Sequence, residues 1–184
     1  MIRTLALLPL IAAVPFSNVA DAAVVHICWI GANGYTMTGR MEFPDALISA
    51  PIVTETDVTS FHITGYLEGQ LIGKWDMASR TASTTWYLRY YPDTMTFPTT
   101  GEQVSPTGID QGWNANGDVT DCGSPGFGFN AANYAQDFCL NGVWVEPSGM
   151  PPETPFKAST EAPYTPDCAG PALVSKRELP QPSN

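Results

Sequence analysis

Basic residues are scarce in this chain of 184 residues, which has 8 lysines and arginines against 18 aspartates and glutamates and a formal net charge of −10. The few basic residues are also scattered along the sequence rather than clustered. Nucleic acids and anionic membrane surfaces are bound by clustered Lys and Arg that neutralise phosphates. We therefore expect no nucleic-acid partner and no electrostatic attachment to a membrane surface.

Histidine is scarcer still, with only His26 and His62, and both lie within strand-like patterns. The sequence contains no G-x-S-x-G nucleophile motif, so we assign no catalytic residue and expect no Ser-His-Asp triad. A glycosidase needs only two carboxylates across a cleft, and the many acidic residues leave that arrangement open without locating it. A secreted hydrolase is therefore the second alternative for function.

Long hydrophobic runs are absent apart from Thr4–Val14, and no apolar run reaches the roughly 20 residues of a membrane-spanning helix. This run follows Arg3 and precedes Ala20-Asp21-Ala22, a small-x-small pattern typical of signal peptidase sites. We interpret residues 1–22 as a cleavable signal peptide, with an uncleaved anchor as the alternative. The mature chain would begin at Ala23, be secreted or periplasmic, and have no membrane span.

The four cysteines, Cys28, Cys122, Cys139 and Cys168, all follow the predicted signal peptide. An even number in an exported chain favours two disulfides, and three pairings are possible. We favour Cys122–Cys139, which closes a local loop, together with Cys28–Cys168, which ties the C-terminal segment to the first strand. A metal site is the alternative, but the sequence has no C-x-x-C spacing to support it.

Strand-like segments dominate the region after the signal peptide. Residues 35–43 alternate apolar and polar side chains, which is the pattern of a half-buried strand. The other expected strands are 24–30, 58–67, 71–77 and 84–91, with a short edge strand at 94–97 and short pieces at 127–129, 138–140 and 143–145. Turn signals separate several of them, including Asn141-Gly142, which favours a tight hairpin. The sequence predicts an all-β, antiparallel β-sandwich over residues 23–145, with an open barrel as the alternative.

Three segments lack a strand pattern. Residues 99–126 are rich in Gly, Asn, Asp, Ser and Pro and form a long predicted loop, which is often functional. Residues 131–137 are compatible with one helical turn. Residues 146–184 contain 9 prolines, so we predict an extended tail, which Cys168 can fix to the domain.

The predicted loop contains the most distinctive chemistry. Its Asp and Asn oxygens suit calcium, a hard cation that takes oxygen ligands. The candidate ligands are Asp110, Asn114, Asn116, Asp118 and Asp121. The same residue types also form turns, and Asn116-Gly117 is a typical turn sequence. Calcium is the only cofactor that the sequence suggests, and a plain turn is the alternative.

Trp113 is the second candidate site residue, because it lies among polar residues of the same loop. An exposed Trp can stack on a sugar ring, so we predict Trp113 as a ligand-binding platform. The other tryptophans of the strand patterns, Trp29, Trp75 and Trp86, are expected in the core.

Residues Gly34–Phe43 form a G-Y-x-x-x-G-x-x-x-F hairpin pattern, and Asp57–Phe61 follow as D-V-T-S-F. This stretch resembles exported bacterial β-sandwich proteins of uncharacterised function. Many of those proteins end in a sorting tail, whereas Lys176-Arg177 is followed here only by residues 178–184. The resemblance implies no activity and no catalytic residues. We predict an exported, non-catalytic binding or structural domain, with a carbohydrate-binding module as first alternative and a glycan or another exported protein as partner.

Overall fold

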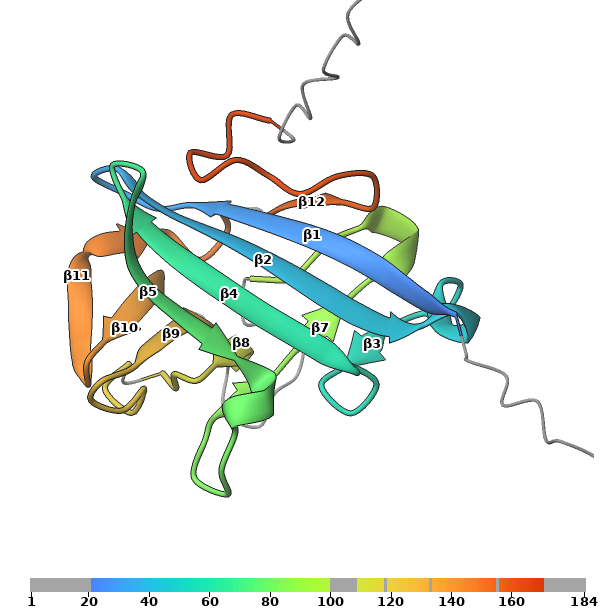
Figure 1. The fold of residues 1–184 in the computed structure, drawn as a ribbon, viewed down its shortest axis with the longest axis horizontal. Helices are drawn as coiled ribbons and strands as arrows, with labels where there is room; N and C mark the ends of the chain where they lie inside the picture. Colours follow the sequence, from blue (N-terminus) through green and yellow to red (C-terminus); the bar gives the residue numbers. More distant parts are fainter. Residues whose placement is uncertain (1–20, 100–108, 118, 133, 155, 171–184) are drawn as a thin grey trace, which may run out of the picture.

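The computed structural model describes residues 21–99, 109–117, 119–132, 134–154 and 156–170. Two antiparallel sheets face each other (Figure 1). The first sheet has the order β12-β1-β2-β4-β5 and contains β1 (Ala22–Ile30), β2 (Tyr35–Pro44), β4 (Ser60–Leu67), β5 (Gln70–Asp76) and β12 (Lys157–Ser159). The second has the order β11-β10-β9-β8-β6 and contains β6 (Trp86–Tyr87), β8 (Ile109–Trp113), β9 (Phe127–Ala132), β10 (Gln136–Leu140) and β11 (Val143–Met150). The protein is all-β and sandwich-like, as predicted.

Short elements complete the fold. Strands β3 (Val53–Thr54) and β7 (Arg89–Tyr90) form a separate antiparallel pair. The single-turn 3-10 helices are η1 (Asp45–Leu47), η2 (Met77–Ser79) and η3 (Pro92–Thr94). None of the helices in the described ranges is long and apolar enough to cross a membrane. The predicted signal peptide lies outside the described residues except at its end, where Ala22 already pairs with Pro44 as the first residue of β1.

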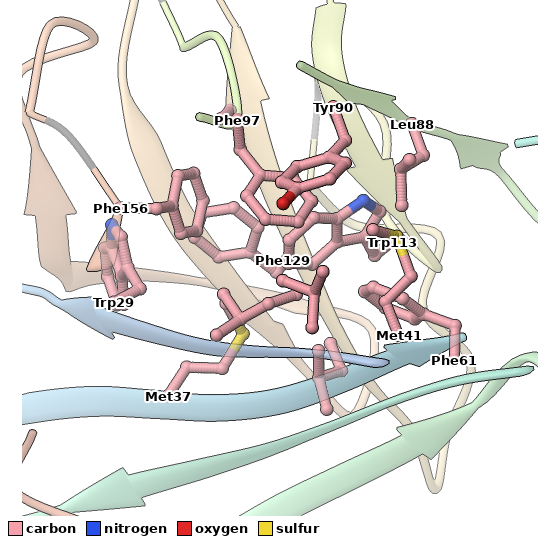
Figure 2. Close-up of a cluster of buried hydrophobic side chains, with 14 of the residues drawn as sticks. Trp29, Met37, Met41, Phe61, Leu88, Tyr90, Phe97, Trp113, Phe129 and Phe156 are labelled. Carbon is pink, nitrogen blue, oxygen red and sulfur yellow. The ribbon is translucent and has the colours of Figure 1, made fainter. Parts of the chain in front are cut away.

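The core lies between the two sheets and is rich in aromatic rings (Figure 2). The alternation predicted for residues 35–43 is confirmed, since Met37, Met41 and Phe43 are buried against the second sheet. The rings of Trp113 and Phe61 pack edge to face with centroids 4.7 Å apart, which joins the sheets through aromatic contact.

Three hairpin turns follow the sequence signals. Their central residues all have positive φ, which Asn and Gly tolerate best. The pairs are Asn33-Gly34, Glu68-Gly69 and Asn141-Gly142. The first joins β1 to β2, the second β4 to β5 and the third β10 to β11. The hairpin predicted at Asn141-Gly142 is confirmed.

The strand expected over residues 84–91 is broken into β6 and β7, each of two residues. Its backbone hydrogen bonds go partly to side chains instead of to a strand: the N–H of Leu88 donates to the Glu55 carboxylate and the N–H of Arg89 to the Gln111 side chain, each at 3.2 Å. Residues 94–97 form no strand beyond a single bridge between Tyr91 and Thr96. The helical turn considered for 131–137 is wrong, because residues 131–132 belong to β9 and residues 136–137 to β10.

The proline-rich segment is part of the domain up to Gly170. Strand β11 continues to Met150, past the boundary expected at residue 145, and β12 pairs with β1. Between them, Phe156 enters the core and packs on Phe129 at 5.4 Å between ring centroids. Prolines restrict the chain to extended conformations, which suits a segment that runs along a sheet. Residues 171–184 of the predicted tail lie outside the described residues.

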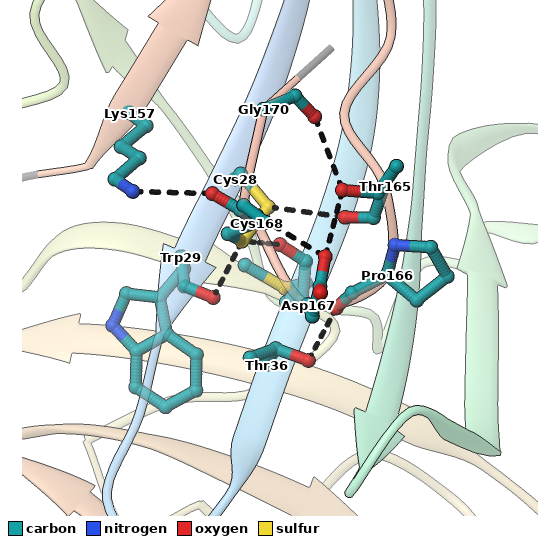
Figure 3. Close-up of a disulfide and its surroundings, with 11 residues drawn as sticks. Cys28, Trp29, Thr36, Lys157, Thr165, Pro166, Asp167, Cys168 and Gly170 are labelled. Carbon is teal, nitrogen blue, oxygen red and sulfur yellow. Dashed lines mark hydrogen bonds between the residues drawn. A yellow bond between two sulfur atoms is a disulfide. The ribbon is translucent and has the colours of Figure 1, made fainter. Parts of the chain in front are cut away.

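Both favoured disulfides are present, Cys28–Cys168 and Cys122–Cys139. The first fixes the C-terminal segment to the outer face of the first sheet (Figure 3). Two hydrogen bonds support this attachment: Lys157 Nζ donates to the Cys168 carbonyl at 3.1 Å and Thr36 Oγ1 to the Pro166 carbonyl at 2.6 Å. Cys168 thus anchors the segment as predicted.

Candidate functional site

Trp113 does not form a surface platform. It is the last residue of β8, its side chain is 0% exposed, and it packs among Phe61, Phe97 and Phe129. The prediction of an exposed ring is wrong, because the polar residues around Trp113 in the sequence belong to a strand whose alternate side chains enter the core. A side chain with no exposed surface cannot stack on a sugar.

The predicted calcium ligands are divided between β8 and the loop that follows it. Asp110 is buried in β8 and does not line the groove described below, whereas Asn114 and Asp121 do. Asp118 lies outside the described residues. In the described ranges, no group of three or more His, Cys, Asp or Glu could hold a metal ion.

Asn114 and Asp121 instead shape the loop before β9. The Asn114 amide donates to the carbonyls of Cys122 and Phe127, at 3.0 and 2.8 Å. The Asp121 carboxylate accepts from the backbone N–H of Asn116 at 2.9 Å and from Thr85 Oγ1 at 2.7 Å. These bonds and the Cys122–Cys139 disulfide fold the loop into one wall of a groove.

The groove has a volume of about 730 Å³, within the range of small-molecule sites. Four segments line it: residues 62–64 of β4, residues 74–76 of the edge strand β5, the loop that follows β5, and a fourth segment before and at the start of β9 that contributes Asn114, residues 121–123 and residues 125–127. The groove therefore lies where β5 ends the first sheet and the loop before β9 approaches it. Its lining is largely polar, and Trp75 and Phe127, which are 7% and 1% exposed, border it from the core.

Hydroxyl groups gather on the loop that follows β5. Thr81 Oγ1 lies 2.9 Å from Ser83 Oγ and 3.3 Å from Thr84 Oγ1, so the three hydroxyls form one network. Thr84 Oγ1 also accepts the backbone N–H of Thr81 at 3.0 Å, which fixes the loop's shape. All three residues line the groove, together with Ser79 and Thr64. Each hydroxyl can donate one hydrogen bond and accept others.

Asp76 holds the start of this loop. Its carboxylate accepts the backbone N–H of Ala78 at 2.8 Å and caps η2, while its carbonyl accepts Ser79 Oγ at 2.6 Å. Asp76 and Asp121 are thus both groove residues and loop supports. Lys74, which also lines the groove, forms no ion pair with any residue in the described ranges.

The two histidines lie on the outer face of the first sheet, on either side of one arginine. In the strand register, His26 of β1 is opposite Arg40 of β2, Arg40 is opposite His62 of β4, and His62 is opposite Asp76 of β5. Burial lowers the pKa of His26, and the neighbouring positive charge of Arg40 and His62 lowers it further. Arg40 forms an ion pair with Glu42. Neither histidine is hydrogen-bonded to a described serine or aspartate, so these contacts form no catalytic triad.

Asp110 and Asp137 are two buried carboxyl groups of the second sheet. Burial raises the pKa of Asp137, while hydrogen bonds from Asn130 and Trp144 act in the opposite direction. Neither carboxyl lines the groove. The pair of carboxylates that a glycosidase needs across a cleft is therefore not formed by these two residues in the groove.

Comparisons with known proteins give no relative for this chain. No protein-family model matches it, and neither a curated protein nor a solved structure does. The resemblance of its first strands to exported bacterial β-sandwich proteins stays a prediction.

Sequence reasoning singled out only one wall of the groove, the predicted loop that contains Asn114 and Asp121. It missed the segments from β4, β5 and the loop after β5, because they carry no motif. The loop 79–84 has one detectable signal, a run of hydroxyl residues from Thr81 to Thr85 interrupted only by Ala82. Such a run is typical of an ordinary polar turn. Only the fold shows that it lines the same groove as Phe127.

Proposed function

We propose that this protein is an exported, non-catalytic binding domain whose groove takes a carbohydrate. The observation that carries the proposal is the network of Thr81, Ser83 and Thr84 hydroxyls in a groove of about 730 Å³. Sugars present many hydroxyls, which can exchange hydrogen bonds with these side chains.

Export is part of the proposal. The signal peptide predicted for residues 1–22 and the two disulfides support a secreted or periplasmic location, since disulfides persist in oxidising compartments. The disulfide Cys122–Cys139 holds the loop that forms one wall of the groove, so an oxidising compartment would also preserve the binding surface.

The experiment is a screen of the disulfide-bonded chain 23–184 on an array of neutral and charged glycans. We expect at least one glycan to bind, and the triple variant Thr81→Ala/Ser83→Ala/Thr84→Ala to lose about tenfold or more in affinity, because each lost hydrogen bond is worth about 0.5–1.5 kcal/mol. The matched control is Ser49→Ala, an exposed serine outside the groove. Absence of any glycan binding, or equal binding by the triple variant, would overturn the proposal.

A further inference from the structure

The first strand of the domain has an unpaired edge over part of its length. Strand β12 pairs with β1 only from Cys28 to His26, and its last residue, Ser159, is opposite His26. The preceding part of β1, residues 22–25, pairs with β2 on one side and with no described strand on the other (Figure 1). We call residues 22–25 the free edge of β1. The predicted signal-peptide cleavage leaves residues 23–25 of this edge in the mature chain.

The free edge of β1 lacks the features that protect other sheet edges. Charged side chains and prolines on an edge strand keep other chains from pairing with it. The edge strand β5 carries Lys74 and Asp76, and the edge strand β11 carries Glu146 and Pro147. Residues 22–25 are Ala-Ala-Val-Val and include neither kind of residue. The free edge is therefore open to pairing with a further strand.

A second pocket, of about 550 Å³, lies beside the free edge. All four residues of the edge line it, together with the core residues Phe43 and Tyr90, and none of its lining residues is charged. Two further lining side chains, Ile48 and Met95, are 52% and 46% exposed. Methionine is flexible and adapts to apolar surfaces of different shapes. The pocket thus suits apolar side chains that approach along the edge.

Tyr90, which lines this pocket, has a hydroxyl group without a described partner. The residue is 1% exposed, and its hydroxyl is hydrogen-bonded to no residue in the described ranges. Burial raises the pKa of Tyr90, so the hydroxyl keeps its proton and can donate a hydrogen bond. A buried donor without a partner costs free energy, which a bound acceptor recovers. A hydrocarbon chain offers no acceptor, whereas a peptide offers its backbone carbonyl groups.

We infer that an extended peptide segment of another protein pairs with the free edge of β1 and places apolar side chains in this second pocket. Successive side chains of a strand point to opposite faces, so every second residue of the segment faces the pocket and is apolar. The segment continues the line of β12, which is antiparallel to β1. Backbone hydrogen bonds give such pairing its affinity, and the pocket gives it specificity. The pocket shares no residue with the groove, so this inference is independent of carbohydrate binding.

A peptide fits this site better than a second copy of the chain does. Two copies that pair through the same edge bring together two chains with a net charge of −10 each, which repel one another. A symmetric contact also requires one surface to supply both the pocket and the side chains that fill it. The alanines and valines of the free edge already line their own pocket and are not available to fill that of a partner. A short uncharged peptide has neither constraint.

The test is fluorescence anisotropy of labelled seven-residue peptides titrated with the chain 23–184. Three peptides alternate threonine with valine, leucine or phenylalanine, and each is compared with a block-ordered isomer of the same composition. We expect at least one alternating peptide to bind about tenfold more tightly than its isomer, because the isomer cannot place all of its apolar side chains on one face. Absence of binding by all three alternating peptides, or equal binding by the isomers, overturns the inference.

Methylated peptides test the backbone pairing. The N–H groups of alternate residues in a strand point to opposite edges, so methylating the threonine amides and methylating the apolar residues' amides block different edges. One methylated form should lose binding about tenfold or more, and the other should keep it. Binding kept by both forms, or lost by both, contradicts pairing along one edge.

Variants locate the binding site. Ile48→Asp places a charge in the lining of the pocket and should weaken peptide binding about tenfold or more, and Tyr90→Phe should weaken it about threefold by removing a hydrogen bond. The matched control is Leu71→Asp, because Leu71 is 62% exposed on β5 and lines neither the pocket nor the groove. Melting curves show whether each variant is folded, and the methylated peptides decide the question if Ile48→Asp does not fold. Binding that Ile48→Asp leaves unchanged overturns the inference.

Two further measurements address other occupants of the site. Decanoate binding that Ile48→Asp weakens, without binding of any peptide, assigns the pocket to an apolar small molecule. A dimer of the chain 23–184 in sedimentation that Ile48→Asp dissociates assigns the free edge to a second copy. Either result overturns the peptide inference and leaves the carbohydrate-binding groove untouched, since the two sites share no lining residue.

Discussion

The ring of Phe127 lies directly on the backbone of Gly65: a β-carbon added to Gly65 would stand 2.3 Å from Cζ of the ring. Gly73, opposite Gly65 on β5, is just as close, at 2.7 Å from Cδ2. Phe127 is 1% exposed and cannot move aside. Two glycines on paired strands therefore make the space in which the first residue of β9 approaches the first sheet and lines the groove.

Gly65→Ala should destabilise the protein by about 1–3 kcal/mol, because the added methyl group overpacks the site of the Phe127 ring. Urea denaturation measures the change. Gly170→Ala is the control, since a β-carbon there meets nothing within 4 Å. The double variant Gly65→Ala/Phe127→Leu should recover part of the loss; a double variant no more stable than the sum of the two single changes would contradict the contact.

The disulfides should contribute unequally. Cys28–Cys168 spans 140 residues and Cys122–Cys139 spans 17. In the chain-entropy model these loops stabilise the fold by about 5 and about 3 kcal/mol. Replacing each pair by alanines and measuring urea unfolding should show the larger loss for Cys28→Ala/Cys168→Ala. A larger loss from the local pair would mean that loop closure is not the dominant effect.

Gln136→Leu should destabilise the attachment of the proline-rich segment. The Gln136 side chain is fully buried, accepts the Trp29 indole N–H at 2.7 Å, and donates to the Pro152 and Thr154 carbonyls at 2.8 and 2.6 Å. Leucine leaves these polar groups without hydrogen-bond partners, which should lower the free energy of unfolding by about 1–3 kcal/mol. Limited proteolysis should then cut residues 151–156 faster than in the parent chain. Gln70→Leu, an exposed glutamine of β5, is the control; equal cutting in both variants would contradict this role.

Asp137→Asn should stabilise the protein at pH 7. Burial raises the pKa of Asp137 in the folded protein above its ordinary value of 3.8. The folded state therefore binds the proton more tightly than the unfolded state does, and stability decreases as the pH rises from about 3.8 through the folded-state pKa. Asparagine keeps the shape and removes this loss.

The measurement is the difference in unfolding free energy between Asp137→Asn and the parent chain from pH 3 to pH 7. The variant should be more stable than the parent chain at pH 7, and this advantage should be smaller at pH 3. Asp93→Asn, on an exposed aspartate, is the control and should show no such trend. A variant that loses stability at pH 7 relative to pH 3 would mean that the hydrogen bonds from Asn130 and Trp144 outweigh burial.

Local signals predicted much of the fold. Positive φ at Asn141-Gly142 needs only the two residues themselves, and the alternation of Met37, Met41 and Phe43 reports one buried face. The pairing of Cys28 with Cys168 follows once the local pair Cys122–Cys139 is assigned, because only two cysteines then remain. Each of these inferences depends on neighbouring residues or on a small number of combinations.

The features that the sequence did not predict depend on contacts between residues far apart in the chain. Trp113 follows four residues of mixed character and precedes a polar loop, and only its packing on Phe61 and Phe129 makes it a core residue. The segment 84–91 has high strand propensity, yet the Glu55 and Gln111 side chains take backbone N–H groups from it. The groove likewise depends on how β5 and the loop before β9 approach each other, which no sequence pattern records.

The most direct test of the carbohydrate-binding groove is an NMR titration of the isotope-labelled chain 23–184 with the tightest glycan from the array. The account predicts that the shifted amide signals cluster at residues 62–64, 74–76 and 79–84 and at the loop before β9, which together line the groove. Shifts that centre instead on the exposed aromatics Tyr134 and Trp144, 88% and 48% exposed, would contradict it.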